Sequence, residues 1–215
     1  NRIVAYKEGD KINGYISFKN IKEGLNTKYL IINEFIYETM EALMGLCSFL
    51  HDQSDQIDRV IIKSQDENLH YLFDNPSNGL YMLIHDFPQC IIGDTAVGMM
   101  YRVINTRRIF ELLDERCFGD ININIKLFVR DDLIDENNEI LILNFADGMV
   151  KISQDGVYEV EVSLDIDNFS SMLMGCVSFS RLHSLGLAEV SKEEYIEKIN
   201  RVFCLDSKPM CTSYF

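Results

Sequence analysis

Tryptophan, proline and basic residues are absent or scarce in this chain of 215 residues. It has no Trp, 3 Pro, and 20 Lys and Arg against 34 Asp and Glu. Few prolines and a hydrophobic share of 47% indicate a folded chain rather than a disordered one. The net charge of -14 excludes a nucleic-acid groove, because phosphate binding needs clustered Lys and Arg. An acidic surface suits a cationic partner and equally serves solubility alone, so charge does not separate these two interpretations.

Metal-binding and membrane signatures are missing as well. The 6 cysteines form no Cys-x-x-Cys pair and the 4 histidines show no ligand spacing, so we predict buried free thiols and no metal site. No run approaches the roughly 18 apolar residues of a membrane span. The first residues, Asn1 to Val4, open a strand pattern rather than a signal peptide. We therefore expect a soluble cytoplasmic protein that contacts neither membrane nor nucleic acid.

The first half of the sequence alternates between strand and helix signals. Two β-rich runs, Arg2–Tyr6 and Gly14–Phe18, flank a polar turn and predict a hairpin. Tyr29–Tyr37 predicts a longer strand. Thr39 is a potential N-cap for a helix whose apolar face includes Met40, Leu43, Met44, Cys47 and Leu50. A further strand is expected over 59–63, a short helix over 68–73, and an apolar run follows at 80–84.

The second half carries an antiparallel pattern. Ile121–Leu127 alternates without fault between apolar and polar residues, and 139–145 and 149–153 predict two further strands across the Asp147-Gly148 turn. The acidic stretch 130–139 resembles a calcium loop only in composition, since it lacks the ligand spacing and central glycine. We therefore expect a solvated hairpin tip there.

A strand, a cap and a helix follow one another within Asp147–Gly175. Within Val157–Leu164, apolar residues alternate with polar, mostly acidic ones. After this strand pattern, the apolar residues fall at i, i+3, i+4 and i+7, namely Phe169, Met172, Leu173 and Cys176. Either Asp165 or Asp167 is expected to cap this helix. Ser191 to Glu194 predict a capping box before the last helix.

Resemblances to three known families follow from the order of these elements. The strand, the Asp-x-Asp cap and the Phe-x-x-Met-Leu-x-Gly helix at 169–175 resemble the edge strand and following helix of a sterol carrier protein type-2-like domain. The order of hairpin, long strand, helix, strand, helix and strand resembles the later part of a GNAT acetyltransferase domain. With the strand-like segment Met99–Ile104 and the aromatic C-terminus, the whole chain resembles the C-terminal portion of an Eis-type (enhanced intracellular survival) N-acetyltransferase.

The resemblance implies an α+β fold in two domains. Residues 1–93 are expected to form an N-terminally incomplete GNAT-like domain with a mixed sheet, and residues 94–215 a sterol-carrier-like domain with an antiparallel sheet and helices. A GNAT domain that binds coenzyme A carries a Gln/Arg-x-x-Gly-x-Gly/Ala loop after its long strand. Here that junction is Phe35–Glu41, which has no glycine and two glutamates. We therefore expect no cofactor on this chain, and acetyl-CoA bound by an absent N-terminal domain.

The implied activity is acetyl transfer from acetyl-CoA to the amines of aminoglycosides or lysine side chains, in a homo-oligomer. In the family the terminal carboxylate is the general base, which here matches the carboxylate of Phe215, with Tyr214 as the neighbouring substrate-binding residue. Alone, the chain is expected to be inactive. Without the resemblance, these two aromatic residues would be interpreted as an anchor for the tail.

A second hypothesis is an apolar ligand-binding module of the sterol-carrier type, with no catalysis. Five residues are expected to line its cavity: Met172, Leu173, Met174, Phe179 and Leu185. Methionine and leucine at helical spacing are more often core residues. A purely structural role in oligomerisation is a third interpretation.

Overall fold

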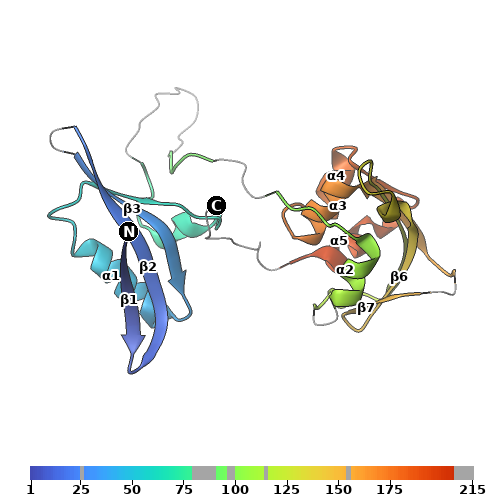
Figure 1. The fold of residues 1–215 in the computed structure, drawn as a ribbon, viewed down its shortest axis with the longest axis horizontal. Coiled ribbons are helices and arrows are strands. Elements are labelled where there is room, and N and C mark those ends of the chain that lie inside the picture. The colour runs from blue at the N-terminus through green and yellow to red at the C-terminus, as the bar shows by residue number, and fades with distance from the viewer. Residues whose placement is uncertain (25–26, 79–90, 96–99, 114–115, 154–155, 206–215) are drawn as a thin grey trace. The chain divides into compact units, whose positions relative to one another are not determined.

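In the computed structural model, the described residues are 1–24, 27–78, 91–95, 100–113, 116–153 and 156–205. They form two compact units, a first unit up to residue 95 and a second unit from residue 100 (Figure 1). Each contains strands and helices, so the predicted α+β class is confirmed. Within these residues, no helix is both long and apolar enough to cross a membrane.

The first unit is a four-stranded sheet with one long helix on it (Figure 1). Its strand order is β1-β2-β3-β4, with β1/β2 and β2/β3 antiparallel and β3/β4 parallel. The elements are β1 (Arg2–Glu8), β2 (Lys11–Glu23), β3 (Thr27–Tyr37), α1 (Met40–His51), β4 (Arg59–Ile62) and the 3-10 helix η1 (Leu69–Leu72). The hairpin, the long strand, the helix, the parallel strand and the short helix are thus where the sequence predicted them. The predicted apolar run at 80–84 lies outside the described residues.

Helix α1 packs on the sheet through a face that only partly overlaps the predicted one, since Leu43 and Leu50 lie on both. Ala42, Leu43 and Leu46 are buried, whereas Met40 and Met44 are 66% and 62% exposed. Two small residues explain the rotation, because Ala42 and Gly45 let the helix approach the sheet closely. A Cβ on Gly45 would lie 2.5 Å from the ring of Tyr6 in β1.

The second unit is a five-stranded sheet with its helices on one face (Figure 1). The strand order is β7-β6-β5-β8-β9. Its strands are β5 (Ile123–Arg130), β6 (Ile140–Ala146), β7 (Met149–Ile152), β8 (Val160–Asp165) and β9 (Ala188–Val190). Its helices are α2 (Thr106–Leu112), η2 (Asp135–Asn138), α3 (Ile166–Leu173), α4 (Phe179–Ser184), η3 (Glu193–Tyr195) and α5 (Ile196–Phe203).

This second sheet is mixed rather than antiparallel throughout. Strands β5 and β8 are parallel neighbours, while β5/β6, β6/β7 and β8/β9 are antiparallel. The strand that the sequence pattern placed at the edge, β8, lies between β5 and β9. The cause is the short strand β9, which pairs with the outer side of β8 and was not predicted.

The core of the second unit lies between the sheet and the helices. Alternate residues of β5, β6 and β8 are buried, and α3 adds Phe169, Met172 and Leu173 as its helical spacing predicted. Phe118 is 0% exposed, and its ring contacts one aromatic ring in each of α2, β6 and α5: Phe110, Phe145 and Phe203. The described aromatic rings therefore join α2, β6 and α5 into one core.

Several local predictions in the second unit were wrong. Residues 100–105 form no strand, because the N–H of Val103 donates to the hydroxyl of Ser170 (2.9 Å) rather than to a neighbouring strand. The hydroxyl of Ser191 accepts from the N–H of Glu161 and caps no helix, and α5 begins only at Ile196, after η3. Asp165 holds the N-cap position of α3, yet its carboxylate binds Arg130 at 2.7 Å. The alternative in that prediction is confirmed, because the carboxylate of Asp167 accepts from the N–H of Asn168 in the first turn at 2.8 Å.

The cysteine prediction was half right. Cys47, Cys117, Cys176 and Cys204 are the described cysteines, and all are free. None of these four is buried, since Cys117 and Cys204 are exposed and the other two are partly exposed. Within the described residues, no group of three His, Cys, Asp or Glu side chains is arranged to hold a metal ion.

Candidate functional site

The two residues predicted to form the site, Tyr214 and Phe215, lie outside the described residues. Two other places bear on function and can be described atom by atom. One is the junction between β3 and α1, where a GNAT domain holds coenzyme A. The other is a buried polar cluster around Asp131 in the second unit.

The N-terminus of α1 is capped by its own chain. The hydroxyl of Thr39 accepts from the N–H of Ala42 at 3.2 Å, as predicted, and the N–H of Glu38 donates to the carbonyl of Asn13 at 2.8 Å. Glu41 adds a carboxylate to the first helical turn, which stabilises a helix N-terminus by interaction with its dipole.

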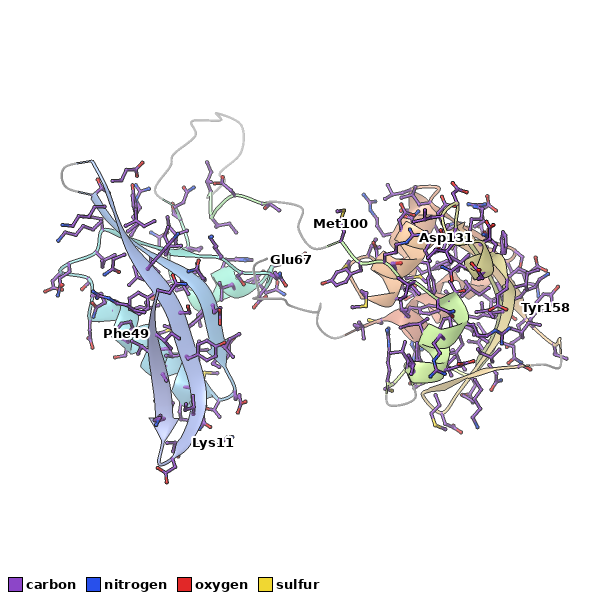
Figure 2. All side chains as sticks on the ribbon, in the orientation of Figure 1. Lys11, Phe49, Glu67, Met100, Asp131 and Tyr158 are labelled. Atoms are coloured by element: carbon purple, nitrogen blue, oxygen red, sulfur yellow. The ribbon has the colours of Figure 1, made fainter. Side chains whose placement is uncertain are left out.

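The charged and polar groups around this junction are mainly hydrogen-bond acceptors. Glu38 pairs with Lys11 (3.4 Å), which lies at the tip of the β1–β2 hairpin (Figure 2), and both side chains are more than 60% exposed. The Oδ1 atom of Asn13 is buried without a hydrogen-bond partner. A pyrophosphate needs free donors at a helix N-terminus, whereas these side chains mainly offer acceptors.

The carboxylate of Asp131 is the centre of a buried polar cluster (labelled in Figure 2). Its Oδ1 atom accepts from Arg102 Nη2 at 2.6 Å and from the backbone N–H groups of Leu133 and Ile134 at 2.9 and 3.1 Å. Its Oδ2 atom accepts from Asn137 Nδ2 at 2.8 Å. Asp131 is 3% exposed, so the expectation of a solvated hairpin tip was wrong for this residue, although Asp132, Asp135 and Glu136 are exposed as expected.

Asn137 links this cluster to the start of α2. Its Oδ1 atom accepts from the N–H of Thr106 at 2.9 Å, and its Nδ2 atom donates to Asp131. Asn138 exchanges two hydrogen bonds with the backbone of Asp131, at 2.9 and 2.8 Å. The cluster therefore fixes residues 102–106 against the connection between β5 and β6. The only signal in the sequence is the pair of asparagines six and seven residues after Asp131.

The hydrogen bonds hold Asp131 in its charged form. Burial by itself raises the pKa of the carboxyl, but hydrogen bonds from Asn137, Leu133, Ile134 and Arg102 outweigh burial and lower the pKa from 3.8 to about 2. A carboxylate with four donors is a saturated structural group, not a proton acceptor for catalysis. We assign it to stability rather than to chemistry.

Acid is expected to destabilise the second unit through Asp131. Because the pKa is lower in the folded state, the stabilising contribution is complete above the ordinary pKa of 3.8 and is lost as the pH falls towards about 2. The variant Asp131→Asn should be less stable at pH 7 and should lose less stability than the parent between pH 5 and 2. Urea unfolding at several pH values measures both, with the exposed neighbour Asp132→Asn as the control. Equal pH dependence of Asp131→Asn and the parent would contradict the prediction.

The five residues proposed to line an apolar cavity do not share one environment. Met172, Leu173 and Phe179 are at most 1% exposed and belong to the core of the second unit. Met174 is partly exposed, and Leu185 is 52% exposed. The buried three are therefore explained by core packing.

Comparison with known families identifies the class of each half. Residues 1–103 match the family model of the acetyltransferase (GNAT) domain, and residues 109–212 match that of the sterol carrier protein domain. A GNAT-type domain is thus followed along the chain by a domain of the sterol carrier protein type, as the sequence predicted. No curated protein matches the chain significantly.

Several solved structures have a similar fold. A GCN5-related N-acetyltransferase from Anabaena variabilis ATCC 29413 has a TM-score of 0.71 at 20% identity, over 96% of this chain and 48% of that one. A probable N-acyltransferase from Enterococcus faecalis V583 has a TM-score of 0.69 at 16% identity, over 98% of this chain and 48% of that one. Eis1 from Mycobacterium abscessus has a TM-score of 0.65 at 15% identity, over 94% of this chain and 48% of that one. Identities this low show the fold alone. The chain spans about half the length of these proteins.

Proposed function

We propose that this chain serves as the C-terminal portion of an Eis-type N-acetyltransferase. The observation that carries the proposal is the order of the two domain types, GNAT at 1–103 and sterol carrier protein at 109–212. The proposed reaction transfers an acetyl group from acetyl-CoA to an amine, either of an aminoglycoside-like molecule or of a lysine side chain. The net charge of -14 is compatible with a cationic substrate of this kind.

The cofactor belongs, in this proposal, to a preceding catalytic domain. The capped, acidic N-terminus of α1 supports this, because Glu38 and Glu41 would repel phosphate and the junction offers no glycine for close backbone approach. The first unit then contributes walls of the substrate pocket. We further propose that the assembled enzyme is a cytoplasmic homo-oligomer.

The proposed contribution of the tail is the α-carboxylate of Phe215, with Tyr214 beside it at the substrate. Amine acetylation needs a neutral amine at the thioester, so a proton must leave the ammonium group first. A terminal carboxylate ordinarily has a pKa of about 3.3 to 3.7, which is low for a base that works near neutrality. We therefore propose that it orients the ammonium group while water relays the proton.

An acetyl-transfer assay tests whether acetyl transfer requires the preceding catalytic domain. The 215-residue chain alone should release no coenzyme A from acetyl-CoA in the presence of an aminoglycoside or a lysine peptide. A longer protein that ends with this chain and begins with a GNAT domain carrying the cofactor loop should release it. Thiol detection measures both. Acetyl transfer by the 215-residue chain alone would contradict the proposal. The absence of acetyl transfer by the longer protein, with both classes of amine, would contradict it as well.

A further inference from the structure

A narrow stripe of sulfur and imidazole side chains follows the outer face of α1. Met40, Met44, Cys47 and His51 fall at i, i+4, i+7 and i+11. Since an α-helix turns by about 100° per residue, these four lie within about 60° of one another around its axis. Met40 and Met44 are 66% and 62% exposed, Cys47 is a partly exposed free thiol, and His51 is exposed. Ions in solvent can therefore reach the stripe, and core packing does not account for the two methionines.

The helix fixes the spacing of three of these side chains. Its opposite face is anchored in the core by Leu43 and Leu46, which are at most 5% exposed. Met44 and Cys47 are three residues apart and Cys47 and His51 are four apart, so the Cβ atoms of each pair are about 5–6 Å apart. Bonds from a metal ion to sulfur or imidazole nitrogen are about 2.0–2.3 Å long, which is enough to bridge such a pair. Two histidines four residues apart on one helix share a zinc ion in this way.

The types of ligand in this stripe favour a soft monovalent cation. Thiolate and thioether sulfur select Cu(I), and imidazole suits copper as well. Zinc takes its ligands from Cys, His and carboxylate side chains. Within the described residues, no group of three such side chains is arranged to hold a metal ion. The thioether of Met44 supplies a third ligand that suits Cu(I) and not zinc, and the spacing of His and Cys alone does not reveal it.

We infer that Met44, Cys47 and His51 form a surface site for one Cu(I) ion, with a thioether sulfur, a thiolate sulfur and an imidazole nitrogen as its ligands. Burial raises the pKa of the Cys47 thiol, so the ion has to displace a proton. Binding forms one bond between Cu(I) and the thiolate, releases that proton to solvent and leaves the oxidation state of the ion unchanged. Met40 lies about 10 Å along the helix axis from Cys47, outside the site. The inference does not depend on acetyl transfer.

Protection of each cysteine from iodoacetamide measures binding residue by residue. Cu(I) is added to the 215-residue chain without oxygen, a chelator buffers the free ion, and mass spectrometry reports the labelling. Cys47 should be protected at a lower Cu(I) concentration than Cys117, an exposed thiol of the second unit. Met44→Leu and His51→Gln should each raise the concentration that protects Cys47 by at least about tenfold, because even residues that only orient a metal ligand typically contribute that much. Met40→Leu is the matched control and should leave it unchanged.

Methionine methyl resonances give a second measurement that does not depend on alkylation. The methyl signal of Met44, assigned with Met44→Leu, should shift when Cu(I) binds, and it should not shift in Cys47→Ser. The signal of Met40 should stay in place in both proteins. If Met44→Leu and His51→Gln protect Cys47 as the parent does, Cys47 binds the ion as an isolated thiol and the inference is overturned. Protection of Cys47 by Zn²⁺ at lower concentrations than by Cu(I) would overturn it as well.

Discussion

A single glycine added after Phe215 is expected to lower kcat for amine acetylation by about 10²- to 10⁴-fold in the longer enzyme. The addition turns the α-carboxylate of Phe215 into a neutral amide and moves the negative charge about 3.5 Å further along the chain. A group that orients an ammonium ion beside a thioester loses its effect when displaced by that much. Steady-state kinetics with acetyl-CoA and a diamine or aminoglycoside measure the change in kcat. This prediction rests on the proposed function.

The variant Phe215→Leu is the control for this experiment. It keeps the terminal carboxylate and an apolar side chain, so it should retain most of the turnover. If the side chain rather than the carboxylate matters, Phe215→Leu should lose activity and the extended protein should keep it. Normal turnover of the extended protein would remove the carboxylate from the mechanism.

The variant Phe118→Ala is expected to destabilise the second unit by about 3–5 kcal/mol. Phe118 is 0% exposed and lies within 6.4 Å, between ring centroids, of Phe110, Phe145 and Phe203. Truncation removes these contacts and leaves a cavity, because α2, β6 and α5 cannot all move in to fill the space. Urea unfolding followed by tyrosine fluorescence measures the loss, since the chain has no tryptophan.

The matched control is Phe128→Ala in β5. Phe128 is half-buried and points to the opposite face of the sheet from its buried neighbours Leu127 and Val129, so the same truncation should cost on the order of 1 kcal/mol. Equal losses in the two variants would show that Phe118 is not a central core residue.

Patterns that depend on neighbouring residues in the sequence predicted this fold well. The alternation of β5 required a strand with one buried face, and Ile123, Ile125 and Leu127 are at most 2% exposed. Thr39 was recognisable as an N-cap because the interaction is local, from its hydroxyl to the N–H of Ala42. In both cases the determining contacts lie within a few residues.

Features that depend on distant residues could not be predicted in this way. The rotation of α1 is set by Tyr6, which occupies the space over Gly45 from another element. The burial of Asp131 depends on Arg102, 29 residues earlier in the chain. The parallel neighbours β5 and β8 are joined by hydrogen bonds that the period-two pattern does not reveal. The predicted site at the C-terminus stays a prediction.

The parallel pairing of β5 with β8 also has a kinetic consequence. The connection between β5 and β6 has nine residues and that between β6 and β7 has two, so these strands need only local loop closure. By contrast, Ile125 meets Val160 only after the whole meander has been crossed. Closing such a long loop is entropically costly, and proteins rich in distant contacts fold slowly. The meander is therefore expected to form early, and the docking of β8, which places α3 over the core, to limit the rate at which this half of the protein reaches its native state.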